Sequence, residues 1–227
     1  MSDFAGFSVE GLQLLASLAA FDKEQFTANK NATTRLVATP AKDFVRALLP
    51  QLQACIGPDI TGAPKTNGSI APINNDLRFS PDKSPYKDHL LFRFWEGPEK
   101  KIAPTLWVRL SATELGFATG VAFDAAALAR FRTRVGGAEG EAWVAAVASL
   151  AHAHSAELAG SSLKRVPRPW AADHPRAEWL KLDKGLQLRW PEPLPASLTG
   201  PGLVDLCAAR LTACADAHRW LVQTVTG

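Results

Sequence analysis

Cysteine is scarce in this sequence, and its spacing argues against two kinds of stabilising chemistry. The 227 residues include 3 cysteines, Cys55, Cys207 and Cys214, with no C-x-x-C pair among them. A disulfide framework uses an even number of cysteines, and structural zinc sites use closely spaced ligand pairs. We therefore expect a reducing compartment and no structural zinc, with Cys207 and Cys214 on one buried helical face.

Long apolar runs are also absent, which argues against a membrane-spanning helix. No segment of the sequence reaches the roughly 18 uncharged residues that span a bilayer. The apolar stretch near the N-terminus carries Asp3 and Glu10 where a signal peptide would be basic. We therefore expect a cytoplasmic protein.

The chain has little net charge. Its 25 basic and 22 acidic residues give a formal net charge of +3 at pH 7. This value is too small to indicate a nucleic-acid or membrane-surface partner from the overall field. Any site for an anion must therefore be local.

Several catalytic motifs are missing as well. The sequence has no G-x-x-x-x-G-K-[ST], no G-x-G-x-x-G after a strand, no G-x-S-x-G and no H-E-x-x-H. The run RVGGAEGE contains G-G-x-x-G, but it ends a predicted helix, so we give it no functional weight. His152 and His154 point about 200° apart on a helix and cannot bind one metal together. We therefore expect no metal and no cofactor.

The first 57 residues predict three helices, each with a recognisable start. Ser, Thr and Asp side chains accept hydrogen bonds from the free N–H groups of a first helical turn, and proline fits the first helical position. The signals are Ser8 before a helix over 9–20, the capping-box pair Asp22 and Gln25, and Thr39-Pro40 before a helix that Gly57-Pro58 ends. Pro50 either kinks this third helix or marks its last turns.

The segment that follows predicts a β-sheet. Apolar residues alternate with period two in three runs joined by short connections, which favours antiparallel pairing. The residues predicted on one face are Leu90, Phe92 and Phe94; Leu106, Val108 and Leu110; and Leu115, Phe117, Thr119, Val121 and Phe123.

The C-terminal part returns to helices with one strand. The expected elements are a helix from Asp124 to Gly136-Gly137, a helix over 139–158, a short helix over 178–182, a strand GLQLRW and a last helix from Pro201. Together the elements predict an α+β fold, with helices packed at the face and ends of an antiparallel sheet of about five or six strands. A mixed sheet is the alternative. We expect one domain over 1–227, with a helical segment over 1–57, the sheet over 66–123, and helices plus a returning strand over 124–227.

The segment NNDLRFSPDKSPYKD, residues 74–88, concentrates charged and aromatic side chains. If Leu77 and Phe79 face the core, Asp76, Arg78 and Ser80 lie on the other face of the same strand. The donors that follow the turn are Lys83, Tyr86 and Lys87.

Arginine binds carboxylate or phosphate oxygens by two-point contact, lysine adds a mobile charge, and a tyrosine hydroxyl donates to the same anion or acts as an acid. This combination predicts a site for an anionic ligand, with Arg78, Lys83 and Lys87 as binding residues. The alternative is a structural brace, in which Asp76 and Arg78 pair with charges on neighbouring strands and SPDKSPY is a rigid turn.

A second basic loop, LKRVPRPWAADHP, covers residues 163–175. We expect Lys164 and Arg168 to bind an anion there, and His174, which lies beside Asp173, to be a candidate for proton transfer. Its alternative is solvated charge on a loop stiffened by proline. The other notable residues of this loop are Arg165 and Trp170.

The residues RFSPDKSPYKDHL resemble the signature of domain-of-unknown-function family 2461, a mainly bacterial family of about this length. Its motif runs Arg-x-x-Arg-Asp-x-Arg-Phe and then Asp/Asn-Lys-x-x-Tyr. The matching residues are Asp76, Arg78, Phe79, Asp82, Lys83 and Tyr86. FTANK and LKRVPRPWAADHPRAEWL also resemble family segments, so the resemblance spans most of the chain.

This sequence departs from the family motif at two positions, where Pro72 and Asn75 replace arginines. If the family's site is an anion cage, the site of this chain is weaker or altered. The resemblance implies the fold and the grouping of the two basic loops, and it implies no reaction.

Two functional hypotheses follow. In the first, an enzyme or a ligand-binding protein acts on a small anionic molecule, phosphorylated or not, with Asp76, Tyr86 and His174 as proton-transfer candidates. In the second, the motif is a structural brace in a non-catalytic interaction module. The aromatic residues that would contact a protein partner are then Trp95, Trp107 and Trp170.

Overall fold

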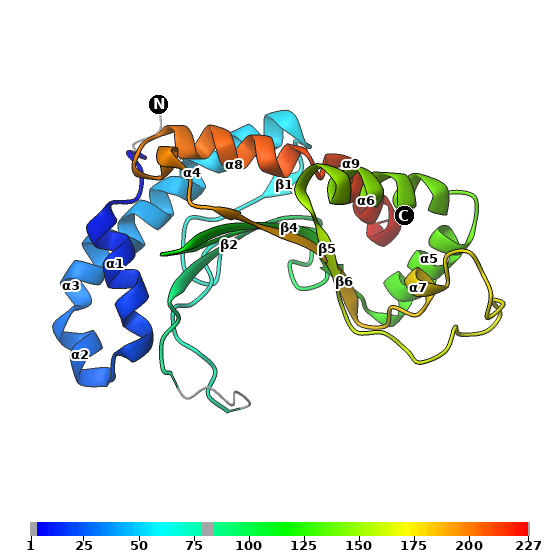
Figure 1. Cartoon of the computed structure of the whole chain (residues 1–227), viewed down its shortest axis with the longest axis horizontal. Helices are drawn as coiled ribbons and strands as arrows, with labels where there is room; N and C mark the ends of the chain where they lie inside the picture. The colour runs from blue at the N-terminus through cyan, green and yellow to red at the C-terminus, as the bar shows by residue number, and fades with distance from the viewer. Residues whose placement is uncertain (1–3, 79–83, 227) are drawn as a thin grey trace. The chain divides into compact units, whose positions relative to one another are not determined.

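The computed structural model describes residues 4–78 and 84–226 of the chain. In this part of the chain, six strands form one mostly antiparallel sheet in the order β1-β2-β3-β4-β6-β5 (Figure 1). The strands are β1 Ile60–Thr61, β2 His89–Glu96, β3 Thr105–Ser111, β4 Glu114–Ala122, β5 Glu157–Ala159 and β6 Gly185–Pro193. The predicted α+β class is confirmed, as is the adjacent order of β2, β3 and β4.

In the central strands, the residues predicted to face the core are the buried ones. Leu90, Phe92 and Phe94 on β2 are buried, and the expected residues of β3 and of β4 up to Val121 are buried as well. Phe123 lies just beyond β4 and is only partly buried. The period-two pattern thus identified the core face because side chains alternate strictly along a strand.

The chain folds into two compact units, each built from three segments. Unit 1 comprises Met1–Phe94, Trp107–Gly116 and Pro191–Arg210; unit 2 comprises Trp95–Leu106, Phe117–Trp190 and Leu211–Gly227. The expectation of a single domain over 1–227 stays a prediction.

Unit 1 contains the N-terminal helices α1 Val9–Ser17, α2 Lys23–Ala28, α3 Lys30–Thr33 and α4 Thr39–Cys55. Two predicted caps are confirmed. The Ser8 hydroxyl accepts from the Gly11 N–H at 3.0 Å. Asp22 and Gln25 form the reciprocal capping box, with hydrogen bonds of 2.7 and 2.9 Å.

Helix α4 begins at Thr39 with Pro40 in its first turn, as predicted, but Thr39 is itself helical and does not cap a free helix end. Helical structure runs from Lys30 through a π-turn at Thr34–Ala38 directly into α4. Pro40 has no N–H to donate to the Leu36 carbonyl, and a locally wider turn accommodates this loss. A Cβ on Gly11 would lie 2.5 Å from that carbonyl oxygen, so α1 makes a close contact with this turn.

Helix α8, Gly202–Thr212, runs beside α4 (Figure 1), where Gln51 donates to Asp205 at 2.7 Å. The single last helix predicted from Pro201 is instead two helices, α8 and α9, the latter at Ala215–Thr226. Cys207 and Cys214 are both buried as predicted, although Cys214 lies between the two helices. Burial raises the pKa of the Cys214 thiol to about 12, which suppresses thiolate chemistry there.

Unit 2 contains α5 Ala125–Gly136, α6 Gly140–His154, α7 Ala177–Leu180 and α9. Asp124 caps α5 as predicted, accepting from the Ala127 N–H at 2.7 Å. The predicted extension of α6 to Leu158 is wrong, because Ser155 ends the helix in a left-handed conformation and the chain continues into β5. Strand β5 pairs antiparallel with β6 and occupies one edge of the sheet.

No helix in the described part of the chain combines the length and the apolar character needed to cross a membrane.

Candidate functional site

The first motif forms a hairpin in unit 1 rather than a strand of the sheet. Asn74 and Tyr86 form an antiparallel bridge, and the Lys87 N–H donates to the Ile73 carbonyl at 2.8 Å. The Asn75 side chain donates across the hairpin to the Ser84 carbonyl at 2.9 Å. Asn75, one of the two departures from the family motif, therefore ties the hairpin arms together.

The prediction that Leu77 faces the core is wrong, since this side chain is 38% exposed. The Asp76 carboxylate accepts from the backbone N–H of Arg78 at 3.2 Å, which turns the chain away from an extended strand. Phe79, Ser80 and Lys83, which the sequence also placed in this motif, lie outside the described residues, as does Asp82.

The structure brings Asp76 and Arg78 together. The guanidinium donates to both carboxylate oxygens, at 2.9 and 2.7 Å. These hydrogen bonds hold the pKa of Asp76 below its ordinary value and raise the pKa of Arg78. Both side chains are largely exposed, so the pair contributes little to stability. An anion that binds Arg78 has to compete with the carboxylate.

Tyr86 lies in a packed position. Its side chain is buried, and its ring stacks on Phe26 of α2 with a centroid distance of 4.2 Å and an interplanar angle of 11°. Ser84, beside it, donates a hydrogen bond to the Ala19 carbonyl. The aromatic ring of the motif therefore fixes the hairpin to the N-terminal helical segment.

Lys87 also has a structural position. Its ammonium group donates to the Pro72 carbonyl and, at 2.9 Å, to the Asn74 carbonyl, and partial burial lowers the pKa of this lysine. Pro72 is the second residue that departs from the family motif, and its carbonyl accepts this hydrogen bond from Lys87.

We expect Lys87→Met to lower the free energy of unfolding by about 1–3 kcal/mol, because it removes charge-assisted hydrogen bonds from two hairpin carbonyls. Chemical denaturation measures the change. Lys23→Met, at an exposed lysine of α2, is the matched control, with an expected change within about 0.5 kcal/mol. Equal stability of the two variants would contradict a bracing role for Lys87.

The second basic loop belongs to unit 2 and is fixed at both of its ends. At the first end, the Leu163 N–H donates to the Lys181 carbonyl at 2.8 Å, and the Asp183 N–H donates to the Ser161 carbonyl at 3.2 Å. These bonds continue the pairing of Ser162 with Leu182.

The other end is seated on glycines at the end of α5. A Cβ on Gly136 would lie 2.3 Å from the Trp170 ring, so only glycine allows this ring to pack there. The Arg176 guanidinium donates to the Gly136 and Gly137 carbonyls at 3.0 and 2.7 Å. The G-G-x-x-G run, to which we assigned no functional weight from the sequence, is thus the place where the loop packs. We call Gly136 and Gly137 the glycine seat.

His174 contributes to the same seat. Its Nδ1 accepts from the Arg176 N–H at 3.0 Å, and its ring meets the Trp170 ring edge-on at a centroid distance of 5.4 Å. The side chain is partly buried. This position gives His174 a role in holding the loop, while proton transfer by His174 stays a prediction.

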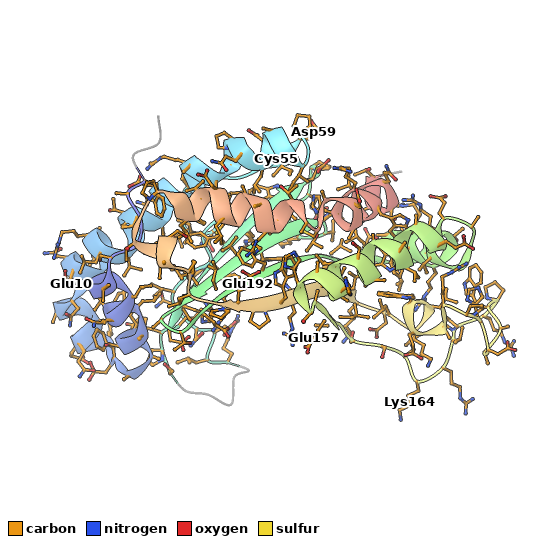
Figure 2. The ribbon with its side chains drawn as sticks, turned by 45° about the horizontal axis from the view of Figure 1, so that its top comes forward. Glu10, Cys55, Asp59, Glu157, Lys164 and Glu192 are labelled. Carbon is orange, nitrogen blue, oxygen red and sulfur yellow. The ribbon has the colours of Figure 1, made fainter. Side chains whose placement is uncertain are left out.

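Between the two anchored ends, the span from Lys164 to Arg168 exposes its cationic side chains. We call Lys164, Arg165 and Arg168 the basic span; all three are exposed. Lys164 points outward from the loop (Figure 2). Among the described residues, none makes a hydrogen bond or an ion pair with these three side chains.

The predicted site residues are therefore divided between the units. Asp76, Arg78, Tyr86 and Lys87 belong to unit 1, whereas Lys164, Arg168 and His174 belong to unit 2. That both loops bind the same ligand stays a prediction.

Over residues 4–78 and 84–226, no group of three or more His, Cys, Asp or Glu side chains could hold a metal ion.

No curated protein sequence matches the chain. A family model described as a conserved hypothetical protein, DUF2461, matches residues 10–220 and so includes the hairpin, the glycine seat and the basic span. The chain belongs to the DUF2461 family.

Proposed function

We propose that this protein binds a small anionic ligand through the basic span. The supporting observation is that Lys164, Arg165 and Arg168 are exposed and have no partner among the described residues, although the span that carries them is anchored at both ends. Like charges repel, and an anion that binds between them relieves this repulsion. A span that is already ordered loses less conformational entropy when it binds.

Two other arginines of unit 2 differ from the basic span because they bind backbone carbonyls. Arg130 donates to the Thr224 and Val225 carbonyls, and Arg132 donates to the Leu180 and Leu182 carbonyls. These guanidinium groups complete the hydrogen bonding of backbone at the ends of elements. The basic span lacks such partners, and this contrast favours a ligand role for it.

Isothermal titration calorimetry with tripolyphosphate and with citrate tests the proposal. We expect saturable binding that weakens as salt rises, because exposed charges are screened. Simultaneous Lys164→Gln, Arg165→Gln and Arg168→Gln should weaken it by about tenfold or more, since charge-assisted hydrogen bonds are lost.

The matched control replaces Lys23, Lys42 and Lys184, also exposed, with glutamine. Each triple variant removes three positive charges, so both change the formal net charge from +3 to 0. Equal weakening in both variants would contradict a local site and leave only a general charge effect. Arg78→Gln, titrated in the same way, tests whether the hairpin contributes to the same ligand.

A protein-interaction role is the second candidate. The tryptophans expected to contact a partner, Trp95, Trp107 and Trp170, are only partly exposed. Instead, Leu158 on β5 and Leu163 at the start of the basic span are 41% and 39% exposed. Exposed apolar side chains at a sheet edge favour partner contact. Concentration-dependent association that Leu158→Lys abolishes, without any anion binding, would favour this candidate.

A further inference from the structure

A second feature of unit 2 lies apart from the basic span in sequence and in charge. The connection between β2 and β3 and the C-terminal end of α9 line a cavity of about 330 Å³ that opens to solvent. Its wall includes the apolar residues Pro98, Ile102, Ala103 and Val225, together with Glu96 and Glu99. This volume lies within the range of pockets for small molecules.

The connection that forms the cavity wall is well ordered by its own hydrogen bonds. The Glu96 N–H donates to the Pro104 carbonyl at 3.0 Å, and the Ala103 N–H donates to the Glu99 carbonyl at 2.9 Å. Gly97 has a φ of 134°, a left-handed conformation that favours glycine. The wall therefore does not have to order itself when a ligand binds.

Glu96 has an unusual partner behind the wall. Its side chain is only 17% exposed, and its Oε2 lies 3.3 Å from Nε2 of His218, whose side chain is fully buried. On its other side, the His218 ring contacts the Thr119 hydroxyl, with Nδ1 at 3.2 Å from Oγ1. The imidazole is thus fixed between a hydroxyl and the cavity-lining carboxylate.

The contact between His218 and Glu96 leaves hydrogen-bonding capacity unused. His218 Nε2 has no hydrogen-bond partner in the described part of the chain, although it faces the Glu96 carboxylate. A carboxylate that is largely removed from water requires a close counter-charge or several hydrogen bonds. Within the described residues, His218 is the only basic side chain within ion-pairing distance of Glu96.

The charges around the cavity favour a cation. No lysine or arginine is among its described lining residues. Lys100, on the same connection, lies over the Trp95 ring at 4.9 Å from its centroid, and Lys101 is exposed. Arg130 donates to carbonyls at the end of α9. Two carboxylates on an apolar wall complement an ammonium group that carries a short hydrocarbon chain.

We propose that this cavity binds a small primary ammonium ion with an aliphatic tail, with the Glu96 carboxylate as its counter-ion. The tail contacts Ile102, Ala103 and Val225, and Glu99 adds a second negative charge at the wall. This site is independent of the proposed anion-binding span, since its ligand has the opposite charge.

Calorimetric titration with n-butylammonium tests the proposal, with n-butanol and butyrate as neutral and anionic ligands of similar size. We expect saturable binding of the ammonium ion and at least about tenfold weaker binding of the other two, because only the ammonium ion makes a charge-assisted hydrogen bond to Glu96. Binding of n-butanol as tight as that of n-butylammonium would overturn the proposal.

Variants separate the roles of charge and shape. Glu96→Gln should weaken n-butylammonium binding about tenfold or more, whereas Glu157→Gln, at an exposed glutamate of the same unit, should leave it unchanged. Unchanged binding by Glu96→Gln would overturn the proposal. Thr226→Trp places a large ring at the cavity wall and keeps the Glu96–His218 pair, so it should also abolish binding. If Glu96→Gln does not fold, retained binding by Thr226→Trp overturns the proposal on its own.

Discussion

Gly140→Ala should lower the free energy of unfolding by about 3 kcal/mol, because the added methyl group has no space. Its Cβ would lie 2.0 Å from the Val135 carbonyl oxygen and 2.6 Å from Nε of Arg176. The carbonyl belongs to α5 and cannot move without distorting that helix. The guanidinium would leave the Gly136 and Gly137 carbonyls, so the seat of the basic loop would be lost together with stability.

Gly202→Ala is the matched control, since Gly140 and Gly202 are both the first residue of a helix. A Cβ on Gly202 would meet its nearest neighbour, the Ser197 Cβ, at an ordinary 3.7 Å. Alanine restricts the unfolded chain more than glycine does, so this variant should gain about 0.4–1 kcal/mol. Chemical denaturation measures both variants. Changes of the same sign and size would show that the close contact at Gly140 does not exist.

Phe131→Ala should lower the free energy of unfolding by about 3–5 kcal/mol, the usual cost of emptying a buried aromatic position. Phe131 of α5 is fully buried at the centre of an aromatic cluster in unit 2. Its ring centroid lies 4.8 Å from that of Phe123, 5.8 Å from that of Trp220 and 6.2 Å from that of Trp143. Trp143 and Trp220 also contact each other, with ring centroids 5.0 Å apart, and cannot collapse into the space without losing that contact.

Phe123→Ala provides the comparison for Phe131→Ala within the same cluster. Phe123 is only partly buried, so water already covers part of its ring and less apolar area is lost. We expect its cost to be less than half that of Phe131→Ala. A loss below about 1 kcal/mol for Phe131→Ala would show that the cluster does not form the core of this unit.

The helices and strands were predictable where their determinants are local. Ser8, Asp22 and Asp124 cap the helices that their positions indicated, because a capping side chain bonds N–H groups two or three residues away. The alternation of β2, β3 and β4 likewise identified their buried faces. The sequence did not indicate that helical structure continues from Lys30 into α4, because the contact of the π-turn at Thr34–Ala38 with Gly11 joins residues distant in sequence.

The candidate site was less predictable. The sequence grouped Arg78, Lys87, Lys164 and Arg168 as equivalent anion-binding residues, since each is a cation near a turn. The structure separates them by partner, because Arg78 pairs with Asp76 and Lys87 donates to backbone carbonyls. These hydrogen-bond partners depend on how the backbone folds, and that fold cannot be predicted in such detail from composition and residue spacing.

What the sequence by itself determined is therefore the α+β class, the capped helices, the core face of the strands and membership of the family, all of which depend on short-range patterns. Only the tertiary structure decided which cations are committed to the fold and which are exposed without partners. It also placed Trp170 on Gly136 and His218 behind Glu96. These pairs are far apart in the chain, and the free energy that joins them comes from packing and hydrogen bonding that exist only after folding.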